Sequence, residues 1–237
     1  FLGEIPKALS DEKIVINNES RTNIAEAFRL LRSNLDFMLT NISLSSSQTI
    51  FVTSTINAEG KSFISLNLAT SLSLTNKKVL LLGMDLRAPT LTKYIGVAER
   101  KGVTNYVTDK KLTLQDVTFS IKQIENLDII VSGVNPPNPS QLLLSDRTKE
   151  LFEEVKNSYD FIVVDTAPVN LVTDTFLISK YADISLYVAR ANYLDKRMLD
   201  VAQGFYNENK LPNMAIILND TDLTQSYGYG YGYGYGY

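Results

Sequence analysis

The single Gly-Lys-Ser of the chain, Gly60-Lys61-Ser62, lies where an apolar run gives way to a helical pattern. Apolar residues of β type precede the loop at Ile50–Val52, and helical spacing begins at Phe63. Backbone N–H groups in such a loop form an anion site, and the helix N-terminus adds roughly half a positive charge. Lys61 could then reach ATP phosphates and Ser62 could ligate Mg²⁺. The alternative is a lysine at an ordinary helix start.

The predicted phosphate loop departs from the usual pattern at two positions. Thr55 stands where the first glycine is usual, and Ala58 stands where a second glycine would ease the turn. The change at Ala58 could tighten the loop without abolishing it. The residues expected to contact the nucleotide here are Thr55, Asn57, Ala58, Glu59, Gly60, Lys61, Ser62 and Phe63.

Two aspartates that follow strand-like runs are expected to face the same crevice as the loop. Asp85 comes shortly after Val79–Leu82, and Asp165 ends the run Phe161–Asp165. The carboxyl ends of parallel strands meet at one edge of an open α/β sheet, where ligands bind. A carboxylate there can hold Mg²⁺ directly or through water, and Asp85 could also act as a base. The alternative for both is an ordinary aspartate in the turn after a strand.

Strand-like runs alternate with helical stretches, a pattern typical of a mostly parallel sheet covered on both faces. We therefore predict a P-loop NTPase-like, three-layer α/β/α domain over residues 1–226. Phe1–Glu19 is expected to be irregular, because Gly3 and Pro6 interrupt it. The strands are expected at residues 49–53, 79–82, 127–131, 161–165, 184–188 and 214–218.

The composition limits the available chemistry. The chain has 237 residues, no cysteine, no histidine and a net charge of −3. Disulfides, thiolate chemistry and imidazole catalysis are excluded, so a general base must be Asp, Glu, Lys or Tyr. The charge gives no broad signal for a nucleic-acid partner.

No apolar run approaches the ~18–20 residues of a membrane span, so we expect a soluble segment. Because it begins without Met, it could be part of a longer chain.

A helix is expected over residues 23–39, with charged residues on one of its faces. Glu26, Arg29 and Arg32 follow one another at spacings of three, which keeps them near one side of the helix. Two interpretations remain open for this trio. It is either a solvated, self-paired surface or a charged contact between subunits.

The C-terminal segment Tyr227–Tyr237 alternates tyrosine with glycine. Such alternation has high backbone entropy and no branched side chain to pack, so we expect a flexible tail. It could be a mobile array of phosphate acceptors, a sticky low-complexity tail or a weak edge strand. The candidate acceptors are Tyr227, Tyr229, Tyr231, Tyr233, Tyr235 and Tyr237.

Together these motifs resemble the bacterial tyrosine kinase family, whose members govern capsular and exopolysaccharide export. The family's Walker A, A′ and B segments are similar to Thr53–Ser62, Leu80–Arg87 and Phe161–Pro168. The resemblance covers nearly the whole chain. Its further matches are the Glu-x-x-Arg-x-x-Arg helix at Glu26, Arg29 and Arg32, the loop Pro136–Ser140 and the C-terminal tyrosine cluster.

The resemblance implies an ATP- and Mg²⁺-dependent autokinase that phosphorylates the C-terminal tyrosines of a neighbouring subunit. Arg87 would stabilise charge, although it could equally form a structural ion pair. Asn219 resembles the adenine-reading asparagine of the related ParA/MinD ATPases. The implied catalytic residues are Lys61, Asp85, Arg87 and Asp165, and the implied metal ligands are Ser62, Asp85 and Asp165.

The resemblance also implies partners. Subunits would form a ring, an octamer in the family, held by the helix at residues 23–39 through Glu26, Arg29 and Arg32. A transmembrane polysaccharide co-polymerase segment, fused or separate, would place the domain at the cytoplasmic face of the bacterial inner membrane. A cognate tyrosine phosphatase would reverse the reaction.

One departure from the family concerns the acidic residues. Gly83 stands where the first of two Walker A′ aspartates is usual, which leaves Asp85 as the one carboxylate there. The main competing function is a ParA/MinD-like positioning ATPase that hydrolyses ATP without phosphorylating tyrosine, but that function does not explain the tyrosine tail. A third possibility is a non-catalytic scaffold whose tail binds a partner, against which the intact Lys61, Ser62, Asp85 and Asp165 count.

Overall fold

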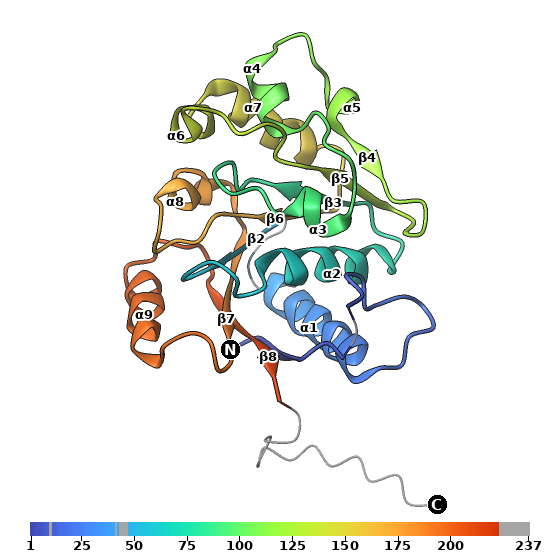
Figure 1. Ribbon diagram of the computed structural model, residues 1–237, viewed down its shortest axis with the longest axis vertical. Helices are drawn as coiled ribbons and strands as arrows, with labels where there is room; N and C mark the ends of the chain where they lie inside the picture. The colour runs from blue at the N-terminus through green and yellow to red at the C-terminus, as the bar shows by residue number, and fades with distance from the viewer. Residues whose placement is uncertain (10, 41, 43–46, 223–237) are drawn as a thin grey trace, which may run out of the picture.

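A mostly parallel, eight-stranded sheet forms the centre of the computed structural model, which describes residues 1–9, 11–40, 42 and 47–222 (Figure 1). The strand order is β1-β8-β7-β2-β6-β3-β5-β4, and only the β4–β5 pair within this sheet is antiparallel. The P-loop NTPase-like α/β/α prediction is confirmed. The strands are β1 Gly3–Pro6, β2 Gln48–Ser54, β3 Val79–Gly83, β4 Phe119–Ser120, β5 Leu127–Ile130, β6 Phe161–Asp165, β7 Ile184–Arg190 and β8 Ala215–Thr221.

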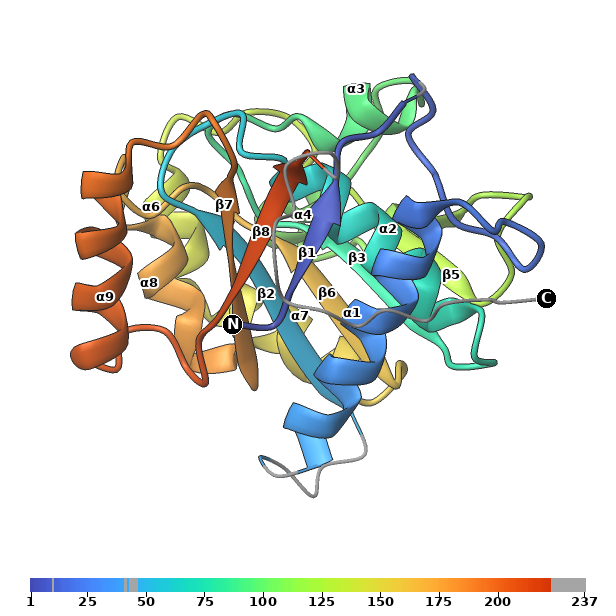
Figure 2. The same ribbon diagram turned by 90° about the horizontal axis from the view of Figure 1, so that it is seen from below.

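Helices cover both faces of the sheet (Figure 2). α1 and α2 pack on one face, while α4, α7 and α8 pack on the other. None of the helices in the described ranges is long and apolar enough to cross a membrane. Their bounds are α1 Asn23–Thr40, α2 Lys61–Ser73, α3 Leu91–Ile95, α4 Val103–Thr108, α5 Leu114–Val117, α6 Pro139–Leu143, α7 Asp146–Lys156, α8 Asp174–Ile178 and α9 Leu199–Asn207, with short 3₁₀ turns at Ser179–Tyr181 and Lys196–Met198.

The continuous apolar runs of the central strands supply two hydrophobic cores. In β2, Ile50 and Val52 join the core under α1 and α2, whereas Phe51 joins the core under α7. The same alternation places Leu81 of β3 on one side and Leu82 on the other. Successive side chains of a strand point to opposite faces, so a strand covered on both faces is apolar along most of its length.

Two strands differ from the sequence prediction. β1 lies within Phe1–Glu19, which was expected to be irregular, and pairs in parallel with β8. Gly3 and Pro6 are tolerated there because β1 is an edge strand and Pro6 is its last residue. The second difference is β4, a two-residue antiparallel edge strand too short to leave a sequence signal. The six predicted strands are present, with ends that differ by a few residues.

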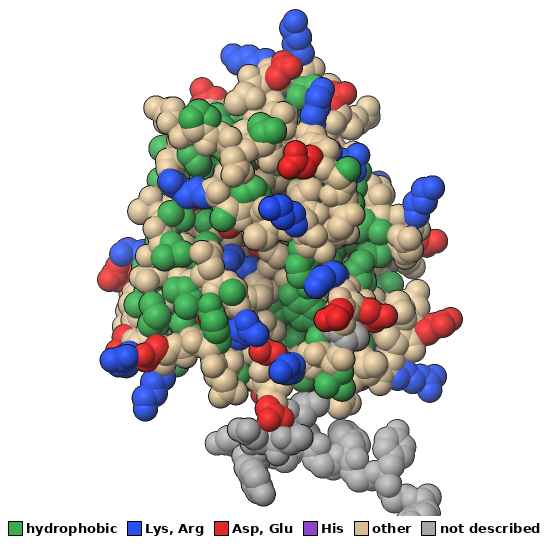
Figure 3. All heavy atoms as spheres, in the orientation of Figure 1, with side chains coloured by type: hydrophobic (Ala, Val, Ile, Leu, Met, Phe, Trp, Pro, Cys, Tyr) green, Lys and Arg blue, Asp and Glu red, His purple; other side chains and the backbone are tan. Residues whose placement is uncertain are grey.

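The face of the molecule seen in Figure 3 carries positive and negative side chains interspersed with one another. No broad area of one sign covers the face that is shown, in keeping with a net charge of −3.

We predict that Ile5→Ala lowers the free energy of unfolding by about 2–4 kcal/mol. Ile5 is fully buried in the core beneath α1, although it lies in the edge strand β1. Urea unfolding followed by circular dichroism measures the change. Glu4→Ala is the matched control, since Glu4 is exposed on the same strand and should change stability by less than about 0.5 kcal/mol. Equal losses in both variants would show that β1 is held by its backbone alone.

Candidate functional site

The sheet register brings the acidic and basic residues singled out in the sequence to one edge. Asp165, the last residue of β6, lies opposite Val52 of β2 on one side and Gly83 of β3 on the other. The chain leaves β2 toward the phosphate loop and leaves β3 toward Asp85. Lys61 and Asp85 are both close enough to Asp165 to influence its pKa. The carboxyl ends of three adjacent strands therefore form one polar site.

The phosphate loop ends at Gly60, which precedes the first residue of α2, Lys61. Gly60 has φ +95°, in the left-handed region, and a Cβ there would collide with the side-chain amide of Asn219. Glycine is therefore required by both backbone conformation and space. No side chain caps α2, so its first N–H groups remain available for an anion. Lys61, mostly buried, adds a positive charge beside them.

Ser62 and Asp165 are joined directly, because the Ser62 hydroxyl donates to Asp165 Oδ2 over 2.6 Å. The other oxygen, Asp165 Oδ1, is buried and meets no hydrogen-bond criterion, although the Ser65 hydroxyl is near enough to affect the Asp165 pKa. Burial raises that pKa to about 6, while Lys61 and Ser62 act to lower it. A buried carboxylate with an unused oxygen beside a serine hydroxyl fits a Mg²⁺ site.

The acidic residues here are few for a cation held by protein alone. Among the described residues, no group of three or more Asp, Glu, His or Cys side chains is placed to hold a metal ion. Mg²⁺ in nucleotide sites is usually held by one or two carboxylates together with substrate phosphates and water. Ser62, Asp165 and Asp85 fit that arrangement, in which the nucleotide completes the shell.

Asp85 is mostly buried, and its Oδ1 accepts hydrogen bonds from the backbone N–H groups of Arg87, at 3.3 Å, and Ala88, at 2.9 Å. These bonds fix the turn that carries it. Gly83 stands where the first Walker A′ aspartate is usual, and the structure shows what lies beside it. A Cβ at Gly83 would lie 3.1 Å from both the backbone nitrogen and the hydroxyl of Ser132, so the loop after β5 packs closely there.

Arg87 is engaged in an ion pair rather than directed freely into the site. Its Nε donates to Asp174 Oδ2 at 2.7 Å and its guanidinium also reaches Asp174 Oδ1 and Ser140 Oγ, each at 3.0 Å. The Asp174 side chain is buried, and its charge is balanced by Arg87. This geometry favours the structural alternative for Arg87, and its catalytic role stays a prediction.

The remaining loop residues divide by side-chain direction. The Thr55 hydroxyl lies 2.8 Å from the Tyr187 hydroxyl, and Phe63 packs against Phe28 of α1, so both side chains anchor the loop to the core. Asn57 is exposed. Glu59 is fully buried, and its carboxylate accepts from the Ile56 N–H at 2.7 Å. Burial raises the Glu59 pKa, and its carboxylate is engaged within the loop, while its contact with the nucleotide stays a prediction.

Asn219 lies at the carboxyl end of β8, under the phosphate loop. Its side-chain Nδ2 donates to the Glu59 carbonyl at 2.9 Å. The amide therefore supports the loop in this structure, and its proposed reading of adenine remains a prediction.

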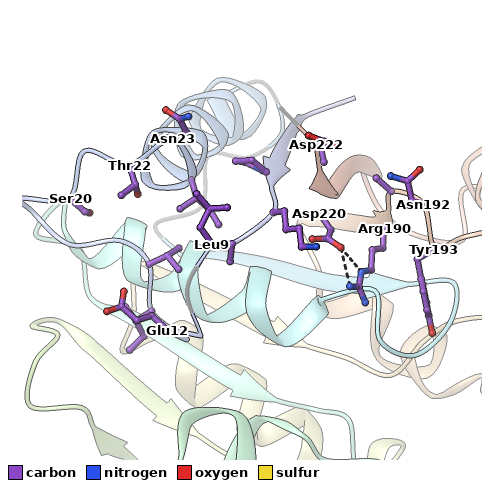
Figure 4. Close-up of a pocket in the computed structure, with 18 of the residues that line it drawn as sticks. Leu9, Glu12, Ser20, Thr22, Asn23, Arg190, Asn192, Tyr193, Asp220 and Asp222 are labelled. Carbon is purple, nitrogen blue, oxygen red and sulfur yellow. Dashed lines mark hydrogen bonds and ion pairs between the residues drawn. The ribbon is translucent and has the colours of Figure 1, made fainter. Parts of the chain in front are cut away.

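A pocket of about 950 Å³ opens next to the loop, between the segment after β1, the approach to α1 and the ends of β7 and β8 (Figure 4). Figure 4 shows Arg190 and Asp220 paired on one wall, with Leu9, Thr22 and Ser20 on the side of the N-terminal segment. Arg190 also donates to the Ala58 carbonyl, so this wall is continuous with the phosphate loop.

Sequence reasoning missed Arg190, Asp220 and Asp174. Arg190 and Asp220 lie at the carboxyl ends of β7 and β8, and Asp174 begins α8. The rule that ligands bind beyond the carboxyl ends of parallel strands would have indicated Arg190 and Asp220. Asp174 gave no such signal, because its partner Arg87 lies 87 residues away in sequence.

The charged trio of α1 is engaged within the chain. Arg29 pairs with Glu26 and donates to the carbonyls of Asn17 and Ser20. Arg32 donates to the Ser71 carbonyl of α2 at 2.6 Å. The self-paired alternative thus describes these contacts, and the subunit contact stays a prediction. The tyrosines of Tyr227–Tyr237 lie outside the described residues.

The fold and the site together define a P-loop nucleotide-binding protein, and comparison with known proteins identifies its family. A family described as an AAA domain matches residues 47–194. The tyrosine-protein kinase YwqD of Bacillus subtilis is 31% identical over 212 residues, which are 90% of this chain and 87% of that protein. The tyrosine-protein kinase ptk of Acinetobacter johnsonii is 34% identical over 195 residues, 82% of this chain, but the match spans about a quarter of ptk's length, 26%.

Among solved structures, the kinase domain of the Escherichia coli tyrosine kinase ETK superposes with a TM-score of 0.82 and 27% identity, covering 98% of this chain and 94% of that domain. This chain belongs to the bacterial tyrosine-protein kinase family. The positioning-ATPase alternative is less supported, because the relatives with this coverage are named as tyrosine kinases.

The raised pKa of Asp165 predicts a pH dependence of stability. With a folded pKa of about 6 against an ordinary 3.8, the folded protein binds more protons than the unfolded chain between about pH 4 and 6. The free energy of unfolding should therefore fall as pH rises through this window. Asp165→Asn should remove the part of this decrease that belongs to Asp165 and leave the smaller part from Glu59 and Asp36, whose pKa values burial also raises. At pH 7 the variant should be more stable than wild type by roughly 1–3 kcal/mol.

Urea unfolding from pH 4 to 7.5, in EDTA and without nucleotide, measures the difference between the two proteins. Asp200→Asn, an exposed position on α9, is the control and should keep the wild-type slope. Parallel pH profiles for wild type and Asp165→Asn would contradict the raised pKa.

Proposed function

We propose that this domain transfers the γ-phosphoryl group of Mg-ATP to tyrosines of the C-terminal tail on a neighbouring subunit. The convergence of Lys61, Ser62, Asp85 and Asp165 at the carboxyl ends of β2, β3 and β6 is the observation that carries the proposal. Phosphoryl transfer needs little covalent help from the protein. It depends on positioning and on charge stabilisation, which these residues can provide.

Phosphate binding is assigned to the loop N–H groups, the N-terminus of α2 and Lys61. When bound, Mg²⁺ neutralises phosphate charge, and Ser62, Asp85 and Asp165 would hold it directly or through water. Asp165 benefits in turn, because a cation stabilises its charged form in the buried site. Lys61 stays beside the transferring group as charge builds on the phosphate oxygens.

Asp85 is the candidate to orient or deprotonate the acceptor. A free tyrosine has a pKa of about 10, so its hydroxyl needs help at neutral pH. The tyrosine oxygen attacks the γ-phosphorus while the bond to the β–γ bridging oxygen breaks, and the phenolic proton passes to Asp85. The products are phosphotyrosine and ADP. Backbone hydrogen bonds to Asp85 Oδ1 hold the carboxylate in place for this role.

The pocket beside the loop is the proposed site for the nucleoside part of ATP. It adjoins Ala58 through Arg190 and is bordered by Asp220 and Thr221, which follow Asn219 in β8. Its volume of about 950 Å³ is ample for a base and a sugar.

The tail and the charged α1 surface support an assembly. The eleven residues of Tyr227–Tyr237, at ~3.3 Å each, reach roughly 36 Å, enough to leave their own domain. We propose that the subunits form a ring through Glu26, Arg29 and Arg32 on the cytoplasmic side of a membrane co-polymerase segment. Each phosphotyrosine adds about −1.5 to −2 charges, so tail phosphorylation would repel neighbours and loosen the ring until a phosphatase acts.

We predict that transfer occurs between subunits. A Lys61→Met chain that carries the tail is mixed with an active chain lacking residues 226–237, in Mg-ATP, and phosphotyrosine is detected by blotting. Label should appear on the inactive chain, whereas Lys61→Met alone should lose about 10²–10³-fold or more of its labelling. Lys149→Met, an exposed lysine of α7, is the matched control and should label itself normally. Absence of label on the inactive chain would mean transfer within one subunit.

We predict that Glu26→Ala dissociates the oligomer. Glu26 is 61% exposed in its side chain and pairs only three residues along its own helix, so its loss should cost the fold at most about 1 kcal/mol. Repeated around a closed ring, the same loss acts at every interface. Sedimentation velocity measures the mass. Glu150→Ala removes an equivalent exposed partner, that of Arg147 on α7, and should leave the assembly intact. An unchanged mass for Glu26→Ala would favour the solvated-face interpretation.

A further inference from the structure

Arg190, the last residue of β7, connects three parts of the nucleotide site. Its NH1 donates to the Ala58 carbonyl at 3.0 Å, and its Nε and NH2 pair with Asp220 Oδ2 at 3.0 and 2.9 Å. Its backbone N–H points at Glu59 Oε1 over a longer 3.4 Å. One side chain thus joins the phosphate loop to the end of β8, and it also forms part of the wall of the 950 Å³ pocket.

Ala58 is in an unusual conformation for a residue with a side chain. Its φ is +64°, in the left-handed region, where glycine is free of strain and alanine is not. Ala58 is also exposed, so packing in the core does not impose this conformation. The carbonyl of Ala58 itself accepts a hydrogen bond from Arg190, beside the bonds that hold the neighbouring Glu59. Asp220 fixes the guanidinium in turn, because two of its donors are committed to that carboxylate.

We propose that Arg190, braced by Asp220, is a positioning residue that keeps the phosphate loop in its binding conformation despite Ala58. The proposal rests on the proposed nucleotide binding and adds a role for two residues outside the phosphate-contacting set. A loop that relaxes at position 58 would turn its backbone N–H groups away from the anion, and the order imposed by Arg190 prevents this.

The competing explanation is that Arg190 serves only as a wall of the pocket. Its guanidinium lies 5.1 Å from the Tyr193 ring, so the two could contact a base together. The two explanations differ in which ligand they affect. A wall residue matters for ADP but not for pyrophosphate, which has no base, whereas a residue that holds the loop matters equally for both.

The test measures binding of Mg-pyrophosphate and Mg-ADP by calorimetry. Arg190→Ala should weaken the binding of both ligands by a similar factor. The expected loss of affinity is about 5–30-fold, if ligand binding must then supply the energy that holds one residue in the left-handed region. In an Ala58→Gly background the same substitution should cost clearly less, because glycine keeps the conformation without support. Arg190→Lys, which retains the charge but not the fork of donors, should restore part of the loss.

Two further variants control for the loss of an arginine as such and for misfolding of Arg190→Ala. Arg197→Ala removes an arginine from an exposed Arg–Asp pair that does not touch the loop, and it should bind both ligands as wild type does. If Arg190→Ala fails to fold, Asp220→Asn leaves Arg190 in place without its brace and should give a smaller, parallel loss for both ligands. Thermal unfolding without ligand identifies which variants are folded.

The outcomes separate this inference from the proposed function. Weaker ADP with unchanged pyrophosphate would make Arg190 a pocket wall, and equal losses with and without the Ala58→Gly substitution would remove the link to position 58. Either result overturns the inference while leaving nucleotide binding intact. Wild-type protein that binds neither ligand would instead overturn the proposed function, and the inference with it.

Discussion

The hydrogen bond from Ser62 to Asp165 is the contact on which the arrangement of the site depends. It joins the first turn of α2 to the end of the central strand β6, so the helix N-terminus and the sheet edge share one polar centre. The cost is a carboxylate buried among apolar strands, which is why its pKa is raised. Lys61, and a divalent cation when present, are the charges that can offset this cost. The stability of the buried carboxylate and the binding of a cation therefore both call for a positive charge beside Asp165.

The central part of the fold could be predicted from the sequence because buried parallel strands are nearly continuous apolar runs. Phe161–Asp165 illustrates this, since its run ends in the aspartate that reaches the site. β1 could not be predicted in the same way. Its Gly3 and Pro6 are usually breakers, and only pairing with β8, more than 200 residues later, makes them a strand. Edge strands depend on partners that local sequence does not show.

The residues of the site likewise divide into those that local sequence indicated and those that it did not. Motif spacing indicated Lys61, Ser62, Asp85 and Asp165, because each follows a recognisable strand. Some of the residues that hold the site together come from distant parts of the chain. Asp174, which forms the ion pair with Arg87, is an example, and no spacing rule connects such a pair. The surroundings of Gly83 are a further feature that the sequence does not show. A Cβ there would lie 3.1 Å from Ser132, so a larger residue would need a small shift of the loop after β5.

The pairing of β1 with β8 has a consequence for how the sheet meets its surroundings. β8 is the strand from which the chain continues toward the tyrosines, and β1 covers its outer side with parallel hydrogen bonds. An uncovered β8 would present a row of free N–H and C=O groups, which is a template for a strand from another molecule. β1 takes over as the edge of the sheet, and it is a four-residue strand ending in Pro6, which has no N–H to offer to a further strand. The strand that β1 covers carries Asn219 and Asp220, so strand pairing at this side of the sheet also fixes the residues that contact Glu59 of the loop and Arg190.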